Sequence, residues 1–316
     1  MPDPIIPLIT FFIPVYNTRP YLRSCLDSVI NQEGDYEIEI IVIDDASPDK
    51  SGELVKHYTD DPRLKFLQHK ENQGAIATWN EGFQLARGKY ISRIDSDDRL
   101  RRDFLKKTVP ILERSSNVGL VYGDIALIDS TGKITSEKNN VNRGNQALIG
   151  DELKAILTSN YIPAPTVLAR REAWMLSIPM PVWLGFCDWY QSVKMAQQWD
   201  FAYVDEVIAD YRVHGGNMHS SMIRDRTGEA TTFRVIQEVF YDENKSFTKA
   251  EQREMLAENY RQYGNSYFGA GMWKDARRCY GNALMNGVRM NPTLRRWVVS
   301  FFPQNFYTAV KKTLKD

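Results

Sequence analysis

The chain has 316 residues, enough for one large domain and a smaller one, and its 40 basic and 40 acidic residues give a formal net charge of zero. This balance provides no general attraction to nucleic acid. The three cysteines, Cys25, Cys187 and Cys279, are widely spaced, which argues against a zinc site or a disulfide framework and favours a reducing compartment. The N-terminal residues do not resemble a signal peptide, and no apolar run approaches the roughly 18 residues of a membrane-spanning helix, so we expect a cytoplasmic protein.

Four short apolar runs alternate with helical stretches in the first hundred residues. The runs span residues 8–13, 38–43, 64–67 and 90–94. This alternation predicts an α/β fold with βαβ units, in which helices flank a mostly parallel, Rossmann-like sheet. Ligands bind at the carboxyl ends of the strands in such sheets. We therefore expect one crevice to be lined by the polar segments that follow the runs, at residues 14–17, 44–47, 72–74 and 95–98.

Three carboxylates in four residues follow the fourth run, in the segment Asp95-Ser96-Asp97-Asp98. Residues i and i+2 at a strand end lie on the same side, so Asp95 and Asp97 can face one hard cation such as Mg²⁺ or Mn²⁺, with substrate phosphates in the remaining positions. The alternative is a solvated helix N-terminus, because Asp is favoured there and residues 99–105 have a helical pattern. An EF-hand is excluded because Leu100 stands where the calcium loop requires glycine.

Single residues near the strand ends are weaker signals. The Tyr16 ring could stack on a nucleotide base, although core packing is an ordinary alternative. Gly74 lets the backbone approach a ligand at a helix N-terminus, where phosphate is favoured, but it also suits a plain turn into a helix. His57 and His69 have the pattern of surface positions on a helix and at a strand end.

The ordered motifs resemble the inverting family 2 glycosyltransferases of the GT-A fold, over about residues 8–220. The resemblance rests on PVYN at 14–17, VIDDASPDKS at 42–51, NQGAIATWNEGFQLARGKYISRIDSDD at 72–98, GFCDWY at 185–190 and YRVH at 211–214. It implies a metal-dependent enzyme that moves a sugar from a nucleotide-diphosphate sugar to a hydroxyl group. The implied acceptor is a glycan or lipid-linked glycan, as in polysaccharide biosynthesis.

The resemblance also implies a role for each matching residue. The nucleotide would be bound by Pro14, Tyr16, Asn17, Asp45, Gly74, Asp95 and Arg212. An acceptor oxygen on Asp45 suits the ring N3–H of uracil, which favours a UDP-sugar. Asp97 and His214 would hold Mn²⁺ or Mg²⁺, and Asp188 would be the catalytic base, although a helix N-cap is the structural alternative for Asp188. The acceptor region would include Pro165, Thr166, Cys187 and Trp189. Two prolines near Thr166 equally suit a stiff strand entry.

Two positions depart from the family pattern. Trp79 stands where the family usually has Arg, so Arg212, Lys70 or the metal would have to neutralise more of the donor diphosphate. Cys187 replaces a Glu, and we expect no nucleophilic role because no His is adjacent and inversion needs no covalent intermediate. These departures keep a catalytically impaired helical-repeat scaffold open as an alternative. A nucleotidyltransferase acting on a sugar phosphate also remains open, whereas a Rossmann dehydrogenase is disfavoured because no G-x-G-x-x-G follows the first strand.

The C-terminal part changes character, so we expect a GT-A domain over residues 1–227 and a helical region over 228–316. One tetratricopeptide-like repeat is indicated by the spacing of Tyr260, Gly264, Tyr267, Gly271, Ala276, Tyr280 and Ala283. A single repeat cannot bury its own face, so we expect it to pack on the catalytic domain or on another subunit. The basic, aromatic tail from Arg295 to Lys315 suits peripheral contact with the inner face of a membrane, or packing on the repeat.

Overall fold

The computed structural model describes residues 8–139, 148–215, 219–287 and 290–301. The chain forms two compact units, one with Met1–Leu153 and Tyr161–Asn217, the other with Lys154–Asn160 and Met218–Asp316. The short segment before Tyr161 therefore belongs with the C-terminal helices. Within that second unit, the Asn259 side chain donates hydrogen bonds to the carbonyl groups of Leu157 (2.7 Å) and Thr158 (3.3 Å).

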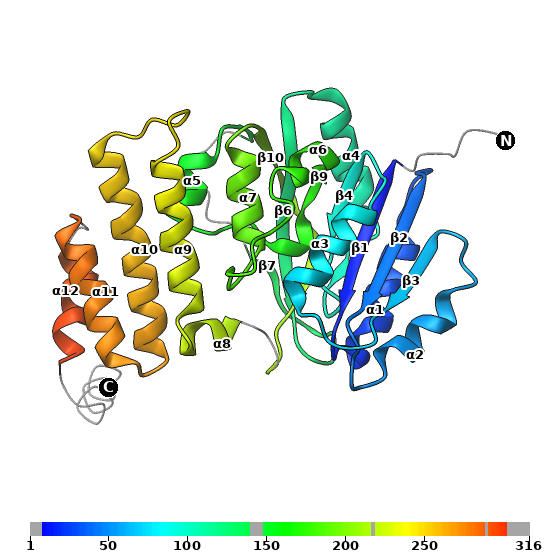
Figure 1. Cartoon of the computed structure of the whole chain (residues 1–316), viewed down its shortest axis with the longest axis horizontal. Helices are drawn as coiled ribbons and strands as arrows, with labels where there is room; N and C mark the ends of the chain where they lie inside the picture. The colour runs from blue at the N-terminus through cyan, green and yellow to red at the C-terminus, as the bar shows by residue number, and fades with distance from the viewer. Residues whose placement is uncertain (1–7, 140–147, 216–218, 288–289, 302–316) are drawn as a thin grey trace. The chain divides into compact units, whose positions relative to one another are not determined.

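The first unit is built on a sheet in which ten strands are described (Figure 1). Its strands follow the order β3 (Leu64–Gln68), β2 (Ile38–Asp44), β1 (Ile9–Val15), β4 (Tyr90–Arg93), β9 (Leu168–Arg170), β6 (Val118–Ile128), β10 (Asp200–Arg212) and β5 (Arg99–Leu100), with β7 (Ile134–Asn139) on β6 and β8 (Ile149–Gly150) on β10. Strands β1 to β4 pair in parallel, which confirms the four predicted strands and their arrangement. Beyond them the sheet is mixed, because β9 runs antiparallel to both β4 and β6.

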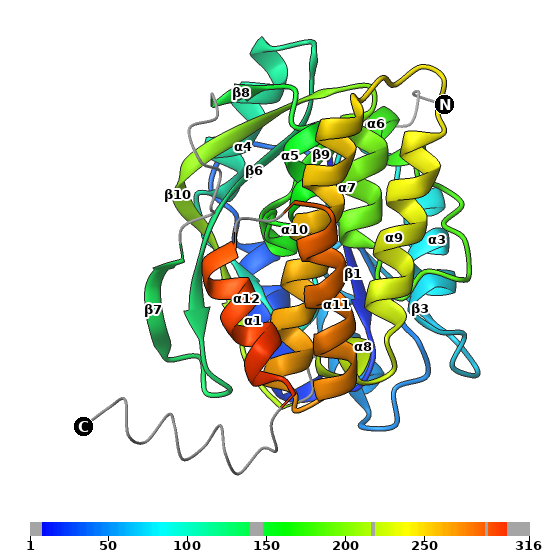
Figure 2. The ribbon, with the colours of Figure 1, turned by 90° about the vertical axis from the view of Figure 1, so that its left-hand side faces the viewer.

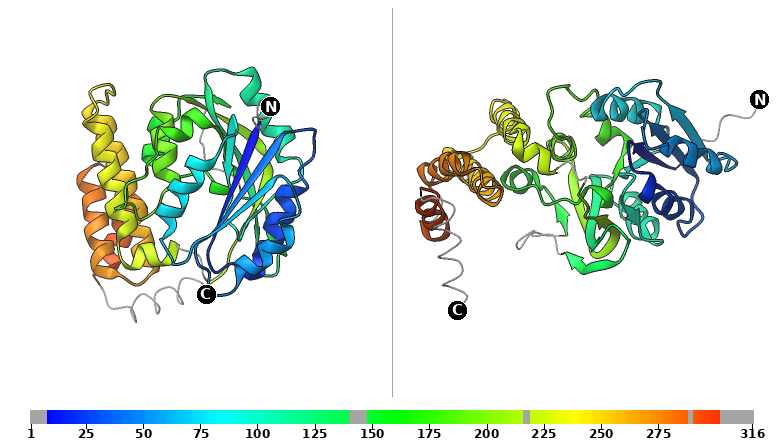
Figure 3. Two further views of the ribbon diagram at one scale, coloured as in Figure 1. Left: turned by 45° about the vertical axis from the view of Figure 1, so that its right-hand side comes forward. Right: turned by 90° about the horizontal axis from the view of Figure 1, so that it is seen from below.

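Helices cover both faces of this sheet (Figure 3). They are α1 (Arg19–Ile30), α2 (Ser51–Val55), the 3₁₀ helix η1 (Lys56–Tyr58), α3 (Ala75–Leu85), α4 (Phe104–Arg114), α6 (Arg171–Met175) and α7 (Asp188–Ala196). Successive strand residues point to opposite faces, so the Phe11 ring lies 6.3 Å from Phe104 of α4, and the Phe12 ring lies 5.6 Å from Phe83 of α3. A Cβ at Gly82 would lie 2.2 Å from the Phe12 ring, so the close packing of α3 on β1 requires glycine there.

The second unit is helical, with α5 (Leu153–Thr158, from Lys154 onward), α8 (His219–Arg224), α9 (Thr227–Phe240), α10 (Lys249–Gly269), α11 (Trp273–Met285) and α12 (Met290–Val299). Helices α10, α11 and α12 pack one against the next (Figure 2). Thr248 and Glu251 form a capping box that starts α10. A Cβ at Gly264 would lie 2.6 Å from the Tyr280 ring, so glycine allows α10 and α11 to approach closely. A helix pair is thus present where the repeat was predicted, and its assignment as tetratricopeptide-like stays a prediction.

Among the described residues, no helix combines the length and the apolar character that crossing a bilayer requires. Helix α12 contains part of the predicted basic, aromatic tail. The rest of that tail, including Lys311, Lys312 and Lys315, lies outside the described residues. The proposed peripheral contact therefore stays a prediction.

Candidate active site

The polar segments that follow β1, β2 and β4 meet at one end of the sheet. Hydrogen bonds connect them: the Asp45 N–H donates to the Val15 carbonyl (2.9 Å), the Asn17 N–H donates to Ser47 Oγ (3.1 Å), and the hydroxyls of Thr18 and Ser96 lie 2.8 Å apart. The convergence expected from parallel strands is therefore confirmed. Pro14 pairs with Ile43 near the end of β1. Tyr16 is 50% exposed, so its ring is accessible for the predicted stacking on a base.

Asp45 is enclosed by the segment that leads into α3. Its carboxylate accepts hydrogen bonds from the backbone N–H groups of Gln73 (2.8 Å) and Gly74 (2.9 Å), and it lies 2.7 Å from Nδ1 of His69. Burial raises the pKa of Asp45, but the hydrogen bonds from Gln73, His69 and Gly74 outweigh it and hold the pKa below its usual value. A carboxylate offers about four acceptor positions, so one remains for the predicted base N–H.

His69 was predicted at the surface, and that expectation is wrong. Its side chain is only 7% exposed, because both ring nitrogens face carboxylates. Nδ1 lies 2.7 Å from Asp45, and Nε2 lies 2.8 Å from Glu81 of α3. The sequence placed His69 at the end of β3, but only the packing of α3 on β1 and β2 brings Glu81 to it.

The segment Asp95–Asp98 is a turn rather than a strand end or a helix start. Strand β4 ends at Arg93, and the Asp98 N–H donates to the Asp95 carbonyl at 3.0 Å. The helical pattern expected over residues 99–105 is also wrong at its beginning. Arg99 and Leu100 form β5, which pairs with β10, and α4 begins only at Phe104. Tertiary pairing with β10 has overridden the local helical preference.

Two of the three carboxylates in this turn lie beside a basic side chain, one from the end of β4 and one from the segment that follows β10. Asp95 forms an ion pair with Arg93, and Asp97 Oδ2 lies 2.9 Å from Nε2 of His214. Burial raises the pKa of Asp95 to about 6; Arg93 opposes this rise, whereas Asp97 and Asp188 add to it. Asp188 is therefore close enough to act on Asp95, which brings the predicted base to the same site as the turn.

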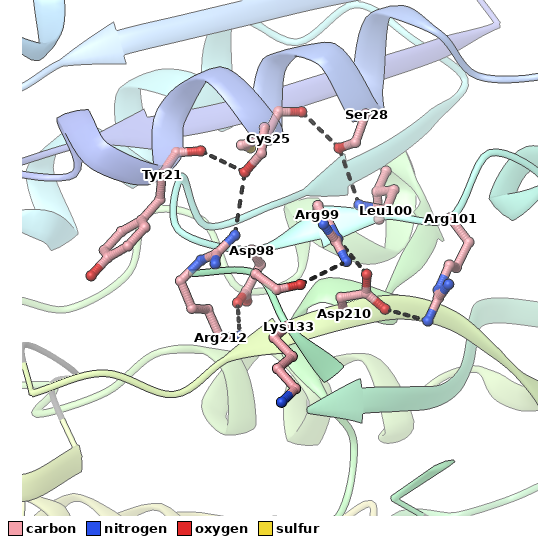
Figure 4. Close-up of polar contacts among 12 residues, drawn as sticks. Tyr21, Cys25, Ser28, Asp98, Arg99, Leu100, Arg101, Lys133, Asp210 and Arg212 are labelled. Atoms are coloured by element: carbon pink, nitrogen blue, oxygen red, sulfur yellow. Dashed lines mark hydrogen bonds and ion pairs between the residues drawn. The ribbon is translucent and has the colours of Figure 1, made fainter. Parts of the chain in front are cut away.

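The third carboxylate, Asp98, is held in a network beneath α1 (Figure 4). Asp98 is 1% exposed and accepts a hydrogen bond from the Arg212 N–H at 2.7 Å. Burial, and then the charges of Asp97 and Asp95, raise its pKa well above the usual value. Nearby on β10, Asp210 pairs with Arg99 and Arg101.

Arg212 is 2% exposed, and its guanidinium forms hydrogen bonds within the protein that attach the turn to its surroundings. Its Nε donates to the Asp97 carbonyl (2.7 Å), Nη1 donates to the Asp129 carbonyl (2.9 Å), and the group lies 4.8 Å from the Tyr21 ring centre. Because Arg212 is almost fully buried, a direct contact with a nucleotide, as predicted for this residue, stays a prediction.

Arg93 and Trp79 form a stacked pair that sequence reasoning missed. Arg93 is 3% exposed, and its guanidinium lies 4.1 Å from the Trp79 ring centre. Burial lowers the pKa of Arg93, but Asp95 and Asp188 outweigh it and raise the pKa above its usual value. The unusual Trp79 thus contacts a cation supplied by β4. The signal available in the sequence was a charged residue inside an apolar run, immediately before three carboxylates.

The predicted base stands at the first position of α7, directly after a buried cysteine. Asp188 begins the helix, and Cys187 occupies the N-cap position without a side-chain cap bond. Burial, with the charges of Asp188 and Asp95, raises the pKa of Cys187 to about 12 although Arg93 opposes the rise. The thiol is therefore neutral near pH 7, as expected for a residue without a nucleophilic role.

The predicted acceptor residues are mostly enclosed. Cys187 and Trp189 are each 2% exposed, and Thr166 is fully buried in the 3₁₀ helix η2 (Ala164–Thr166), where its hydroxyl donates to the Pro163 carbonyl at 2.8 Å. Pro165 is also buried, and η2 packs on β4, β5, β6 and β10. These four side chains are therefore largely closed to solvent, and their contact with an acceptor stays a prediction.

Asp97 and His214 fit a divalent cation. Neighbouring ligand atoms around an ion with bonds of about 2.1 Å lie about 3 Å apart, and the two facing atoms here are 2.9 Å apart. No larger group of metal-binding side chains occurs among the residues that the structure describes. Phosphate oxygens and water would therefore have to fill most of the coordination shell, as is usual for Mg²⁺.

Relatives among curated proteins are named as glycosyltransferases. The chain is 35% identical to an uncharacterized glycosyltransferase of Haemophilus influenzae over 172 residues, which covers 53% of this chain and 64% of that protein. It is 26% identical to the chondroitin synthase of Escherichia coli over 235 residues, covering 74% of this chain and 32% of that protein. The chain thus spans less than two thirds of the length of each.

Two solved structures share the fold. The structure of Staphylococcus aureus TarS residues 1–349 with UDP-GlcNAc superposes with a TM-score of 0.64 at 18% identity, covering 88% of this chain and 81% of that one. The mannosyltransferase PcManGT of Pyrobaculum calidifontis with GDP-Man and Mn²⁺ gives 0.62 at 17% identity, covering 96% and 83%. The sequence pattern of glycosyl transferase family 2 matches residues 10–168, half of the chain. This chain belongs to glycosyl transferase family 2 and has a GT-A-like fold with additional C-terminal helices.

Proposed function

We propose that this chain is an inverting glycosyltransferase that uses a nucleotide-diphosphate sugar and a divalent cation to glycosylate a hydroxyl group. The observation that carries the proposal is the pairing of Asp97 with His214, 2.9 Å apart, beside Asp95 and within the electrostatic reach of Asp188. All four belong to segments that resemble motifs of the family. The three carboxylates would repel one another without a bound cation or the basic side chains around them.

In this proposal the nucleotide lies over the ends of β1, β2 and β4. The exposed Tyr16 stacks on the base, Asp45 accepts a base N–H, and the segment around Gly74 and Asn17 surrounds the ribose and phosphates. A uracil base suits Asp45, so a UDP-sugar is the favoured donor. A bound Mn²⁺ or Mg²⁺ supplies positive charge to the leaving diphosphate. Support for this donor class comes from the TarS and PcManGT structures, whose titles name UDP-GlcNAc, and GDP-Man with Mn²⁺.

Asp188 acts as the general base in this proposal. It takes the proton of the acceptor hydroxyl as that oxygen attacks the anomeric carbon from the side opposite the leaving nucleotide. The buried cation of Arg93 interacts electrostatically with both Asp95 and Asp188, so it offsets part of the negative charge that gathers at this site. The neutral thiol of Cys187 takes no part in the transfer.

Product identity tests the proposal. Purified protein is incubated with UDP- and GDP-sugars, with and without Mn²⁺, and both nucleoside diphosphate and pyrophosphate are measured. We expect cation-dependent release of nucleoside diphosphate. Asp97→Asn should abolish that release and the cation-dependent nucleotide binding seen by calorimetry, whereas Asp60→Asn, at an exposed Asp, should leave both unchanged. Pyrophosphate would instead indicate a nucleotidyltransferase, and binding without turnover would indicate an impaired scaffold.

In the same proposal, residues 228–316 perform no chemistry and position the enzyme or its acceptor, at a membrane surface inside the cell or in an oligomer. The support is that every predicted catalytic residue precedes this region. A truncation that tests this must leave α10 in place, because the Asn259 side chain of α10 donates hydrogen bonds to the carbonyl groups of Leu157 and Thr158 of α5. Deletion of residues 294–316, which keeps α5 and α8–α11, should leave donor hydrolysis intact and lower binding to vesicles that contain anionic lipid.

A further inference from the structure

Three titratable side chains from separate segments form a chain beside the predicted nucleotide site. Asp45 follows β2, His69 follows β3, and Glu81 lies in the middle of α3. The His69 ring lies between the two carboxylates, with distances of 2.7 Å to Asp45 and 2.8 Å to Glu81. Asp45 and His69 side chains are 5% and 7% exposed, so solvent screens their contact weakly.

The hydrogen bonds of this Asp45–His69–Glu81 cluster determine the protonation state of the His69 ring. An ionised carboxylate only accepts, so both ring nitrogens of His69 must donate, and this requires the imidazolium form. The pKa shifts agree with this form. Burial lowers the pKa of His69, but its hydrogen bonds to Asp45 and Glu81 outweigh the burial and raise the pKa above the usual value. Loss of one proton would place an unprotonated nitrogen against a carboxylate oxygen and break one of the two bonds.

The cluster controls the geometry of the segment that leads into α3. The Asp45 carboxylate also accepts the N–H groups of Gln73 and Gly74, and Gly74 has a φ of 88° that favours glycine. His69 restrains one oxygen of Asp45 and, through Glu81, ties Asp45 to the body of α3. The orientation of Asp45 and of the N-terminus of α3 therefore depends on the protonated ring.

We infer that His69 is a positioning residue for nucleotide binding, which in its protonated form orients Asp45 toward the base and fixes the start of α3. This inference rests on the proposed function, because it assigns a role within the same nucleotide site. Nucleotide affinity should contain a contribution that is present at low pH and is lost as the pH rises through the pKa of His69.

The experiment compares the wild type with His69→Gln and with a matched control, His57→Gln, which changes an exposed histidine on η1. Affinity for UDP or GDP, whichever the wild type binds, is measured by calorimetry with Mg²⁺ from about pH 6 to about pH 8.5. The nucleotide phosphate also titrates in this range. The ratio of variant to wild-type Kd at each pH removes its effect, because the same nucleotide is used with all three proteins.

We expect His69→Gln to weaken binding about tenfold at the low end of the range, as for loss of one charge-assisted hydrogen bond. The ratio should fall toward one at the high end, and the His57→Gln ratio should stay near one throughout. A ratio for His69→Gln that is independent of pH would overturn the inference while leaving the proposed function intact. Absence of binding of either nucleotide to the wild type would overturn both.

A second measurement does not depend on the nucleotide. The chain has four histidines, so their ring signals can be resolved by NMR and assigned with single variants. His69 should titrate above its usual value of 6.5, and a midpoint below 6.5 would overturn the inference. If His69→Gln fails to fold, Glu81→Gln serves instead, because the Glu81 side chain is 39% exposed. It removes one bond of the cluster and should reproduce the pH trend with a smaller ratio, about threefold.

Discussion

Replacing Arg93 with Met should destabilise the first unit by about 3 kcal/mol. Methionine matches the length of the aliphatic stem, so the substitution removes the charge with little change in volume. The guanidinium lies 4.1 Å from the Trp79 ring centre in a desolvated position, where a cation–π contact contributes about 2 kcal/mol. The ion pair with Asp95 adds at most about 1 kcal/mol, because the Asp95 side chain is 36% exposed and partly screened.

Urea unfolding, monitored by circular dichroism, measures this loss in the free energy of unfolding. Divalent cations are left out so that no bound ligand adds to the stability. Double-mutant cycles separate the two contacts. Arg93→Met combined with Trp79→Leu should show a coupling of about 2 kcal/mol, and combined with Asp95→Asn about 1 kcal/mol. The control Arg102→Met removes a 75% exposed arginine and should change stability by less than about 0.5 kcal/mol. Zero coupling between Arg93 and Trp79 would refute the stacking argument.

Three further predictions concern the base, the cysteine and a buried glutamate. Asp188→Asn should keep nucleotide affinity near wild type while turnover falls by about 10²–10⁴, the usual range for a general base, and near-normal turnover in steady-state kinetics would exclude that role. Cys187→Ser should retain much of the activity, since the thiol is neutral; a glycosyl adduct on Cys187 found by mass spectrometry would contradict this. Glu39 contacts Lys65 and Arg87, and although burial raises its pKa, these hydrogen bonds hold the pKa below 4.5. Its stabilising contribution is therefore present near neutral pH and lost as the pH falls through the folded-state pKa. Glu39→Gln should lower the free energy of unfolding by about 1–3 kcal/mol at neutral pH, and the difference should shrink in a series of unfolding curves below pH 4.5; a constant difference would refute the assignment.

The sequence by itself determined the parallel half of the sheet and the edge at which the polar segments that follow its strands meet. Apolar runs of β-branched residues specify buried strands through local pattern, and parallel strands necessarily bring their following segments to one edge. The convergence of Tyr16, Asp45 and the Asp95–Asp98 turn followed from that geometry alone. The roles of Asp97, Asp188 and His214 are predictions from the resemblance to the family.

Only the tertiary structure decided which partners these residues have. Pairing with β10 turned Arg99 and Leu100 into a strand, where the local pattern indicated a helix. Arg93 stacks on Trp79, which lies 14 positions earlier in the chain, and His69 bridges Glu81 and Asp45, which lies 24 positions before it. Such contacts depend on how α3 packs on the sheet, and hydrophobic periodicity carries no information about which side chains then meet. Which charged side chains pair with each other at the site was therefore decided only by the packing of the elements.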